Sequence, residues 1–522
     1  MKNTNKRANG ELVKTLLCLV AVLAISIPAY SRGGKMSKEK QIGQVFTPDY
    51  LVQDILDVTG YNSSNSILKK HIIDNSCGNG AFLTEVVRRY CEAHIKEMKN
   101  KRGLVNALCK YVHGVELDEV AYVECVENLN KVAKEYGIEG VAWDVKNADT
   151  LTITDFDGRM DYVVGNPPYV RVHNLENNFT KVKQFKFCTG GMTDLYLVFY
   201  EIGLRMLSEN GKLCYIAPSS WINSVAGHNM RTFVRDNKCL RKIIDLGHYQ
   251  PFKATAYTAI VLLSKSSGDA NFLYCTYEGP HKIDEVEWIN YQDAFFDSCL
   301  YLGSSKALKS FREVKTKCVP KYVSVKNGFA TLADDVFISS NFPFEEFIIP
   351  VIKASTGKWR KCFYPYDHNG KQLSTEEIFS NKKVAEYLRL HKDELLKGKS
   401  EQSHPLWYLF GRTQALKDVW VPKMAVNTCV RDVASLKINS VPTGSGVYSG
   451  LYVLHTIPEE YIVKALMTDD FIEYIKMLKK YKSGGYYTFN SKELEQYLNC
   501  KLDLLLPEKF RKKIGKQEML DL

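Results

Sequence analysis

The residues best suited to chemistry lie in the turn Asn166-Pro167-Pro168-Tyr169, which directly follows an apolar, strand-like run. The two prolines fix φ and remove N–H donors, so the turn is rigid and its carbonyls point outward. Asn166 can present its amide oxygen, and Pro167 its main-chain carbonyl, to one amino group. Two acceptors on an aromatic amine draw its lone pair toward tetrahedral character and make it a better nucleophile, while Tyr169 offers a flat face for a base. An ordinary Pro-Pro turn is the alternative.

A second candidate is the segment Asp74-Asn75-Ser76-Cys77-Gly78-Asn79-Gly80, which follows an expected strand. Gly78 and Gly80 let the backbone bend tightly and let a ligand approach the main chain. The helix that follows offers free N–H groups at its N-terminus. Because glycine turns often serve helix packing alone, this segment is a weak signal by itself.

Two acidic residues follow later expected strands. Glu116 can accept hydrogen bonds from a ribose diol, although an N-cap or a solvated charge is the alternative. Its spacing from Gly80 exceeds that of the dinucleotide fingerprint, which disfavours a nicotinamide cofactor. Asp149 could accept a hydrogen bond from an exocyclic amine, but taken alone it is more often a helix cap.

The elements that must position these residues alternate between strands and helices from Gln41 to about Ser264. Apolar runs and three- and four-residue periodicity predict them. The expected strands are His71–Asp74, Tyr111–Glu116, Val141–Asn147, Met160–Gly165, Lys212–Ala217, Lys242–Leu246 and Ala256–Leu263, with helices such as Ala81–Met98, Asp118–Tyr136 and Leu195–Leu207. This order predicts an α/β fold with a largely parallel sheet covered on both faces. Ligands then bind beyond the carboxyl ends of the strands.

The chain is long enough for several domains. Its 522 residues are 45% hydrophobic and 25% charged, which is typical of a globular protein. After about Ser266 the sequence becomes rich in Lys and Tyr with weaker periodicity, which suggests a mixed α/β recognition domain. We expect an N-terminal extension over 1–35, a catalytic domain over 36–265, a connecting segment over 266–320 and a recognition domain over 321–522.

Charge and cysteine content restrict the partners. The formal net charge of +11 is compatible with a polyanion but does not prove one. None of the fourteen cysteines forms a C-x-x-C pair, so we expect neither a zinc site nor a disulfide framework, but reduced and mostly buried thiols.

Taken in order, these motifs resemble those of the gamma-class type II DNA adenine-N6 methyltransferases, the TaqI-like modification enzymes. The resemblance runs from Gln41 over nearly the whole chain. It rests on the glycine segment, the two acidic residues, the unaltered Asn-Pro-Pro-Tyr turn, and the blocks Gln44–Pro48, Thr193–Tyr196, Gly211–Trp221 and Pro251–Lys253. One departure is Asn75, where the family usually has proline; we expect a small change in loop rigidity without loss of binding.

The resemblance implies a Rossmann-like sheet that binds S-adenosyl-L-methionine, and it assigns roles to single residues. It implies that the catalytic residues are Asn166, Pro167, Pro168 and Tyr169, and that Tyr169 and Phe252 stack on the base. It implies cofactor contacts from Thr47, Asp74, Ser76, Cys77, Gly78, Gly80, Glu116, Asp149 and Asn166.

The C-terminal half also resembles the specificity domain of that family. Its blocks are Ser324–Gly328, Phe363–Tyr366, Trp407–Arg412 and Ser483–Tyr487. Basic residues interleaved with aromatic ones suit phosphates and exposed bases, so we expect DNA contacts from Arg412, Lys482, Tyr486 and Tyr487. For the last block, a solvated basic helix end is the alternative.

The resemblance implies site-specific methylation of adenine N6 in double-stranded DNA. We expect a cytoplasmic monomer that does not bind a membrane, and no metal, because the sulfonium is already a good leaving group. It leaves room for a separate cognate restriction endonuclease. The alternatives are a methyltransferase acting on an RNA guanine or a protein glutamine through the same turn, and a DNA-binding module on an inactive fold.

The first residues conflict with a cytoplasmic location. Basic residues precede the apolar run Leu16–Ile27, and small residues follow it, as in a signal peptide. Either the protein is exported or its true start is Met36. We favour the second explanation, because the implied cofactor is intracellular.

Overall fold

The computed structural model describes residues 46–62, 65–172, 179–188, 193–252, 256–266 and 268–511. The segment 1–35, with its two competing explanations, lies outside the described residues. Within the described part of the chain, no helix is both long enough and apolar enough to span a membrane.

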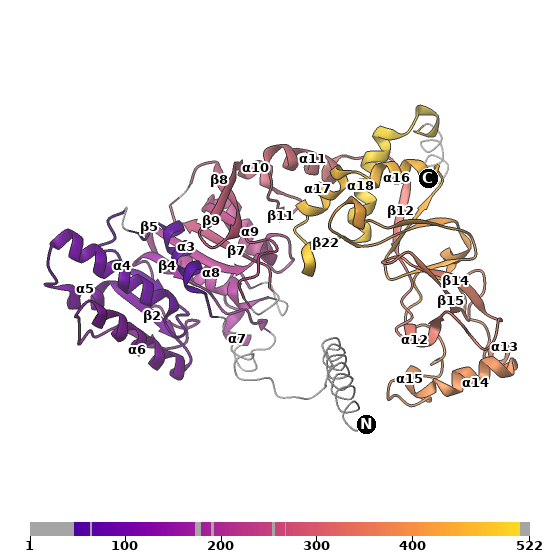
Figure 1. Cartoon of the computed structure of the whole chain (residues 1–522), viewed down its shortest axis with the longest axis horizontal. Coiled ribbons are helices and arrows are strands. Elements are labelled where there is room, and N and C mark those ends of the chain that lie inside the picture. Colours follow the sequence, from indigo (N-terminus) through magenta and orange to yellow (C-terminus); the bar gives the residue numbers. More distant parts are fainter. Residues whose placement is uncertain are drawn as a thin grey trace, which may run out of the picture. The chain divides into compact units, whose positions relative to one another are not determined.

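The first part of the chain, which begins in indigo in Figure 1, forms one large sheet. It has nine strands in the order β3-β2-β1-β4-β5-β7-β6-β8-β9. Strands β3, β2, β1, β4 and β5 run parallel, and β7 is antiparallel to both of its neighbours. The strands are β1 (Ile72–Asp74), β2 (Val112–Glu116), β3 (Asp144–Asn147), β4 (Met160–Gly165), β5 (Leu207–Pro218), β6 (Leu240–Asp245), β7 (Thr258–Ser264), β8 (Asn271–Gly279) and β9 (Lys282–Asn290). The sheet therefore continues past residue 265 through β8 and β9.

Helices cover both faces of this sheet because neighbouring residues of each strand point to opposite sides. Ile72 of β1 packs in one core cluster with helices α3, α4 and α6, whereas Ile73 packs in the other with α8. The helices of this part are α3 (Asp49–Thr59), α4 (Ala81–Met98), α5 (Leu104–Tyr111), α6 (Glu119–Glu135), α7 (Phe179–Val182), α8 (Leu195–Met206) and α9 (His228–Asn237), with the 3₁₀ turn η2 (Ser219–Ile222).

The C-terminal part contains smaller sheets with the orders β12-β20-β16-β18, β13-β15-β14-β19 and β17-β22-β21. Its strands are β10 (Phe295–Phe296), β11 (Cys299–Leu300), β12 (Val323–Asn327), β13 (Ile338–Ser339), β14 (Ile348–Lys353), β15 (Lys358–Phe363), β16 (Lys423–Val426), β17 (Cys429–Val430), β18 (Ile438–Val441), β19 (Gly446–Tyr448), β20 (Leu451–His455), β21 (Tyr481–Lys482) and β22 (Tyr486–Thr488). Its helices are α10 (Tyr291–Ala294), α11 (Ser305–Thr316), α12 (Asp334–Phe337), α13 (Thr375–Ser380), α14 (Lys382–Leu390), α15 (Lys392–Leu396), α16 (Glu459–Leu466), α17 (Asp469–Met477) and α18 (Ser491–Leu505), with the 3₁₀ turns η3 (Lys417–Trp420), η4 (Val433–Ser435) and η5 (Ser483–Gly485).

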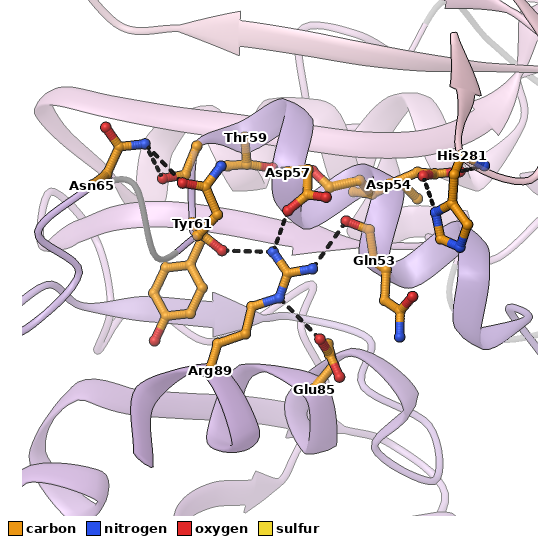
Figure 2. A network of polar contacts seen from close by, with 12 residues as sticks. Gln53, Asp54, Asp57, Thr59, Tyr61, Asn65, Glu85, Arg89 and His281 are labelled. Atoms are coloured by element: carbon orange, nitrogen blue, oxygen red, sulfur yellow. Dashed lines mark hydrogen bonds and ion pairs between the residues drawn. The ribbon is translucent and has the colours of Figure 1, made fainter. Parts of the chain in front are cut away.

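Helix α3 is fixed to α4 by the guanidinium of Arg89 (Figure 2). Its nitrogens donate to the Asp57 carboxylate at 2.6 Å, to the Tyr61 carbonyl at 2.9 Å and to the Gln53 carbonyl at 3.3 Å, and Nε donates to Glu85 at 2.9 Å. Thr47 lies two residues before the start of α3, the helix that this network holds against α4. The Arg89 side chain is only 13% exposed, so these charge-assisted bonds are partly shielded from water.

Candidate active site

The candidate residues meet at the carboxyl ends of neighbouring strands. In the parallel register, Asp74 of β1 lies opposite Gly114 of β2 and Val164 of β4. Glu116 at the end of β2 lies opposite Asn147, two residues before Asp149. The sheet therefore brings the glycine segment, both acidic residues and the Asn-Pro-Pro-Tyr turn to one edge, as the strand–helix alternation predicts.

The glycine segment folds over the end of β2 and holds Glu116. The Gly78 N–H donates to Glu116 Oε2 at 2.7 Å, and the Asp118 N–H donates to Oε1 at 2.9 Å. Gly78 and Gly80 adopt positive φ values of 53° and 89°, which favour glycine. Each carboxylate oxygen can accept a further hydrogen bond, so Glu116 is oriented for a ligand with hydroxyl groups.

The other residues of this segment differ in what they can offer. The thiol of Cys77 is buried and forms a hydrogen bond with the thiol of Cys125. This hydrogen bond, together with burial, raises the pKa of the Cys77 thiol. Cys77 can therefore reach a ligand only through its main chain. The Ser76 hydroxyl is buried and has no hydrogen-bond partner among the described residues, which leaves it able to bind a polar ligand.

Asp74 lies under the turn at the end of β4. Its Oδ1 accepts a hydrogen bond from the Ser76 N–H at 3.0 Å, and burial raises its pKa to about 7. Gly165 has a φ of 148°, and a Cβ at this position would lie 2.6 Å from Asp74 Oδ1. Gly165 therefore permits the contact between the two segments. Gly165 was not among the predicted site residues, although a glycine directly before Asn166 is a usable signal.

The departure at Asn75 has a structural explanation. Its side chain is fully buried, and Oδ1 accepts a hydrogen bond from the Tyr215 hydroxyl at 2.7 Å. Its main-chain carbonyl accepts a hydrogen bond from the Thr150 hydroxyl at 2.6 Å. The hydrogen bonds of Asn75 thus hold the segment in place, whereas a proline would restrict it by fixing φ.

Asn166 contacts Thr47, which is 119 residues earlier in the chain. The amide Nδ2 donates to the Thr47 hydroxyl at 3.1 Å, which fixes the amide with its oxygen directed away from Thr47. Thr47 also lines a pocket of about 410 Å³ together with Phe46, Asn79 and Gly80. The half-buried Asn166 therefore lies beside Thr47, and Thr47 in turn shares a pocket with Asn79 and Gly80 of the glycine segment.

Tyr169 and Phe252 also come together. Their ring centroids are 6.4 Å apart with an interplanar angle of 82°. The Tyr169 hydroxyl donates to the Ile216 carbonyl at 3.3 Å, and burial raises the pKa of Tyr169 well above its usual value. Pro167 is buried and Pro168 half-buried, so the turn is packed on one side.

Asp149 has a neighbour that the sequence did not indicate. Its Oδ1 accepts the Leu151 N–H at 3.0 Å, as in a cap, while Lys181 of α7 places Nζ 3.1 Å from Oδ2. An amine donor thus already lies where the resemblance implies that a cofactor amine would bind. No periodicity or motif links these two residues.

The expected DNA contacts lie in different surroundings. Arg412 and Lys482 are exposed. Tyr486 is half-buried, with the guanidinium of Arg431 5.5 Å from its ring centroid. Tyr487 instead lies edge-on to His248, with the centroids 4.9 Å apart.

Comparisons with known proteins agree with this architecture. The chain is 31% identical to the type II methyltransferase M.BstVI of Geobacillus stearothermophilus over 45% of this chain and 44% of that protein. It is 26% identical to the type II restriction enzyme and methyltransferase RM.Eco57I of Escherichia coli over 84% of this chain and 55% of that protein. The chain thus spans about half the length of these curated relatives.

The fold is shared with the solved type IIL restriction-modification enzyme MmeI, described in complex with DNA. The TM-score is 0.57 at 13% identity, covering 85% of this chain and 63% of that one. The expected α/β methyltransferase-like fold, with further sheets in the C-terminal part, is confirmed. Residues 88–252 match the family model of the Eco57I restriction-modification methylases, and the chain is therefore similar to the methyltransferases of type II restriction-modification systems.

Proposed function

We propose that this chain is a site-specific DNA methyltransferase that transfers the methyl group of S-adenosyl-L-methionine to the N6 atom of an adenine in double-stranded DNA. The observation that carries the proposal is the contact between Asn166 and Thr47. This contact supports the proposal because it joins a turn suited to holding an aromatic amine to Thr47, a residue expected to contact the cofactor. The similarity to type II methyltransferases supports the same activity.

The residues of the sheet edge fit this cofactor. Glu116, oriented by two main-chain N–H groups, would accept hydrogen bonds from the ribose hydroxyls. The buried Ser76 hydroxyl would bind a polar group of the methionine part. Asp149 would accept a hydrogen bond from the amine of the cofactor's adenine once the Lys181 side chain has moved away. When bound, the cofactor supplies an electrophilic methyl group on a sulfonium, which is already a good leaving group.

The remaining work is the positioning of an extruded base. Extrusion costs about a few kcal/mol, and stacking on Tyr169 and Phe252 would return roughly 1–3 kcal/mol per contact. The Asn166 amide oxygen and the Pro167 carbonyl then hold the two protons of the amine and orient its lone pair. Positioning supplies much of the acceleration. No strong base is required, because the methylated aromatic amine is acidic enough to lose its proton to water.

Expression in a methylation-free host, followed by sequencing that detects N6-methyladenine, tests this proposal. We expect a modified adenine at one sequence motif. In the Asn166→Ala variant, we expect the rate of methylation to fall at least about a hundredfold, because the amine loses one of its two hydrogen-bond acceptors. Cofactor binding should persist. Asn237→Ala is the matched control, because Asn237 is an exposed residue at the end of α9. Undiminished methylation by the Asn166→Ala variant, or no modified adenine with the unaltered chain, would contradict the proposal.

A further inference from the structure

The segment Tyr481–Thr488, here called the junction hairpin, consists of β21, a glycine turn and β22. In its antiparallel register Tyr481 lies opposite Tyr487, and Lys482 lies opposite Tyr486. Opposed residues share a face of a hairpin, and successive residues alternate between faces. The junction hairpin therefore has one face made by Tyr481 and Tyr487 and another made by Lys482 and Tyr486.

The first face packs on the end of the catalytic sheet. The Tyr481 hydroxyl donates to Asp245 Oδ2 at 2.5 Å. The rings of Tyr481 and Tyr487 meet the His248 ring edge-on, with centroid distances of 5.1 Å and 4.9 Å. Just before the hairpin, Lys479 Nζ lies 3.1 Å from Asp245 Oδ2, and the two side chains are 14% and 5% exposed. Loss of one partner of a buried ion pair leaves an uncompensated charge, so this pair holds the start of the hairpin at Asp245.

Asp245 also organises the loop that leads to the base-stacking residue. Its Oδ1 accepts the Gly247 N–H at 2.9 Å, so one carboxylate binds both the loop and the junction hairpin. Further along the loop, the Tyr249 hydroxyl donates to the hydroxyl of Tyr50 in α3 at 3.0 Å. The loop then reaches Phe252, whose ring meets Tyr169. The hairpin and the loop that ends at Phe252 are therefore joined through the Asp245 carboxylate.

The second face has the chemistry of a DNA contact. Lys482 is exposed, and Arg431 of the neighbouring loop lies over the Tyr486 ring. Gly484 and Gly485 turn the chain with φ values of 75° and 78°, and Gly484 is exposed at the tip. Cations beside an aromatic ring suit the sugar–phosphate backbone of a duplex and an exposed base.

We propose that the junction hairpin positions the duplex against the base pocket. Lys482, Tyr486 and Arg431 bind the DNA on one face, while Tyr481 and Asp245 on the other face set the loop that carries Phe252. Asp245 and Tyr481 are positioning residues, which touch neither the base nor the cofactor. This inference rests on the proposed function, because it needs an extruded base between Tyr169 and Phe252.

The test uses the full chain and two duplexes that carry the recognition sequence. One keeps the target adenine, for measuring kcat and KM, and the other has 2-aminopurine in its place, for fluorescence. Tyr481→Phe removes only the hydroxyl that binds Asp245. Tyr452→Phe is the matched control, since its hydroxyl also donates to a carboxylate, Asp418 Oδ2, at 2.7 Å, but within the C-terminal part. Lys482→Ala probes the opposite face of the hairpin.

We expect Tyr481→Phe to lower both kcat and the fluorescence rise on extrusion by roughly tenfold, as for the loss of one charge-assisted hydrogen bond, with KM for DNA and thermal stability like those of Tyr452→Phe. Lys482→Ala should raise KM for DNA several-fold at unchanged kcat. The inference is overturned if Tyr481→Phe keeps the kcat and fluorescence of the control, or if Lys482→Ala leaves KM unchanged. A wild-type chain that extrudes the base without methylating it would instead refute the proposed methyl transfer and leave the positioning role supported.

Discussion

Replacement of Asp74 by Asn is expected to stabilise the protein at neutral pH while it weakens the proposed site. Burial raises the pKa of Asp74 from 3.8 to about 7, with a smaller contribution in the same direction from the charge of Glu116. The Ser76 N–H donates to Asp74 Oδ1, and an Asn oxygen can accept the same bond.

The magnitude follows from proton linkage. Between 3.8 and about 7, the folded state keeps a proton on Asp74 that the unfolded state has released, so stability falls as the pH rises through this window. The difference between the two pKa values corresponds to about 4 kcal/mol at most, since one pKa unit is about 1.4 kcal/mol. The Asn side chain does not titrate. The gain from Asp74→Asn should therefore be absent near pH 4 and reach its full size at about pH 7 and above.

Urea unfolding of both proteins between about pH 4 and pH 8 measures this difference, and other titrating groups cancel in the comparison. A difference in unfolding free energy that stays constant across this range would refute the reasoning. Calorimetric titration with S-adenosyl-L-methionine at about pH 8 gives the second half of the test. Under the proposed function, the more stable Asp74→Asn variant should bind the cofactor more weakly, because the carboxylate facing a cationic ligand is lost.

Three further substitutions test how the site is held. Arg89→Met should lower the free energy of unfolding in urea by about 3 kcal/mol, because the partners of a shielded guanidinium lose their charge-assisted bonds. The control Arg88→Met, at a side chain that is 38% exposed, should lower it by less than about 1 kcal/mol, and equal losses would contradict this account. Gly165→Ala should abolish methylation and weaken cofactor binding, since the added Cβ meets a carboxylate oxygen at 2.6 Å, and normal turnover would show that the contact is dispensable. Lys181→Met should strengthen cofactor binding up to about fivefold in calorimetry by freeing Asp149 from an exposed ion pair, so a weaker affinity would argue against competition at that carboxylate.

The elements with strong periodicity could be predicted from the sequence. Met160–Gly165 and Ala81–Met98 form the strand and the helix that their apolar patterns predict, with the same bounds. Strand β9 could not be foreseen, because most of Lys282–Asn290 is exposed on the last strand of the sheet, where burial imposes no apolar alternation. The catalytic domain expected over 36–265 therefore ends before the sheet does.

The site was predictable where the strand order alone determines it. Glu116 and the Asn-Pro-Pro-Tyr turn had to reach one edge of the sheet, because parallel strands share their carboxyl ends. The contact of Lys181 with Asp149 depends instead on the path of a connecting segment, which no local pattern encodes. Likewise, the motif containing Tyr486 and Tyr487 gave no indication that the two rings lie on opposite faces of a hairpin, since that is decided by the pairing register.

The bond between Asn75 and Tyr215 makes two positions that are 140 residues apart interdependent. A proline at position 75 would leave a buried phenol hydroxyl without its acceptor, at a cost of about 1–3 kcal/mol. A phenylalanine at position 215 would in turn leave the buried amide oxygen without its donor. Exchange of either residue alone thus lowers the stability of the folded protein. An evolutionary path between the asparagine and proline forms of the glycine segment must therefore change both positions together or pass through a less stable ancestor.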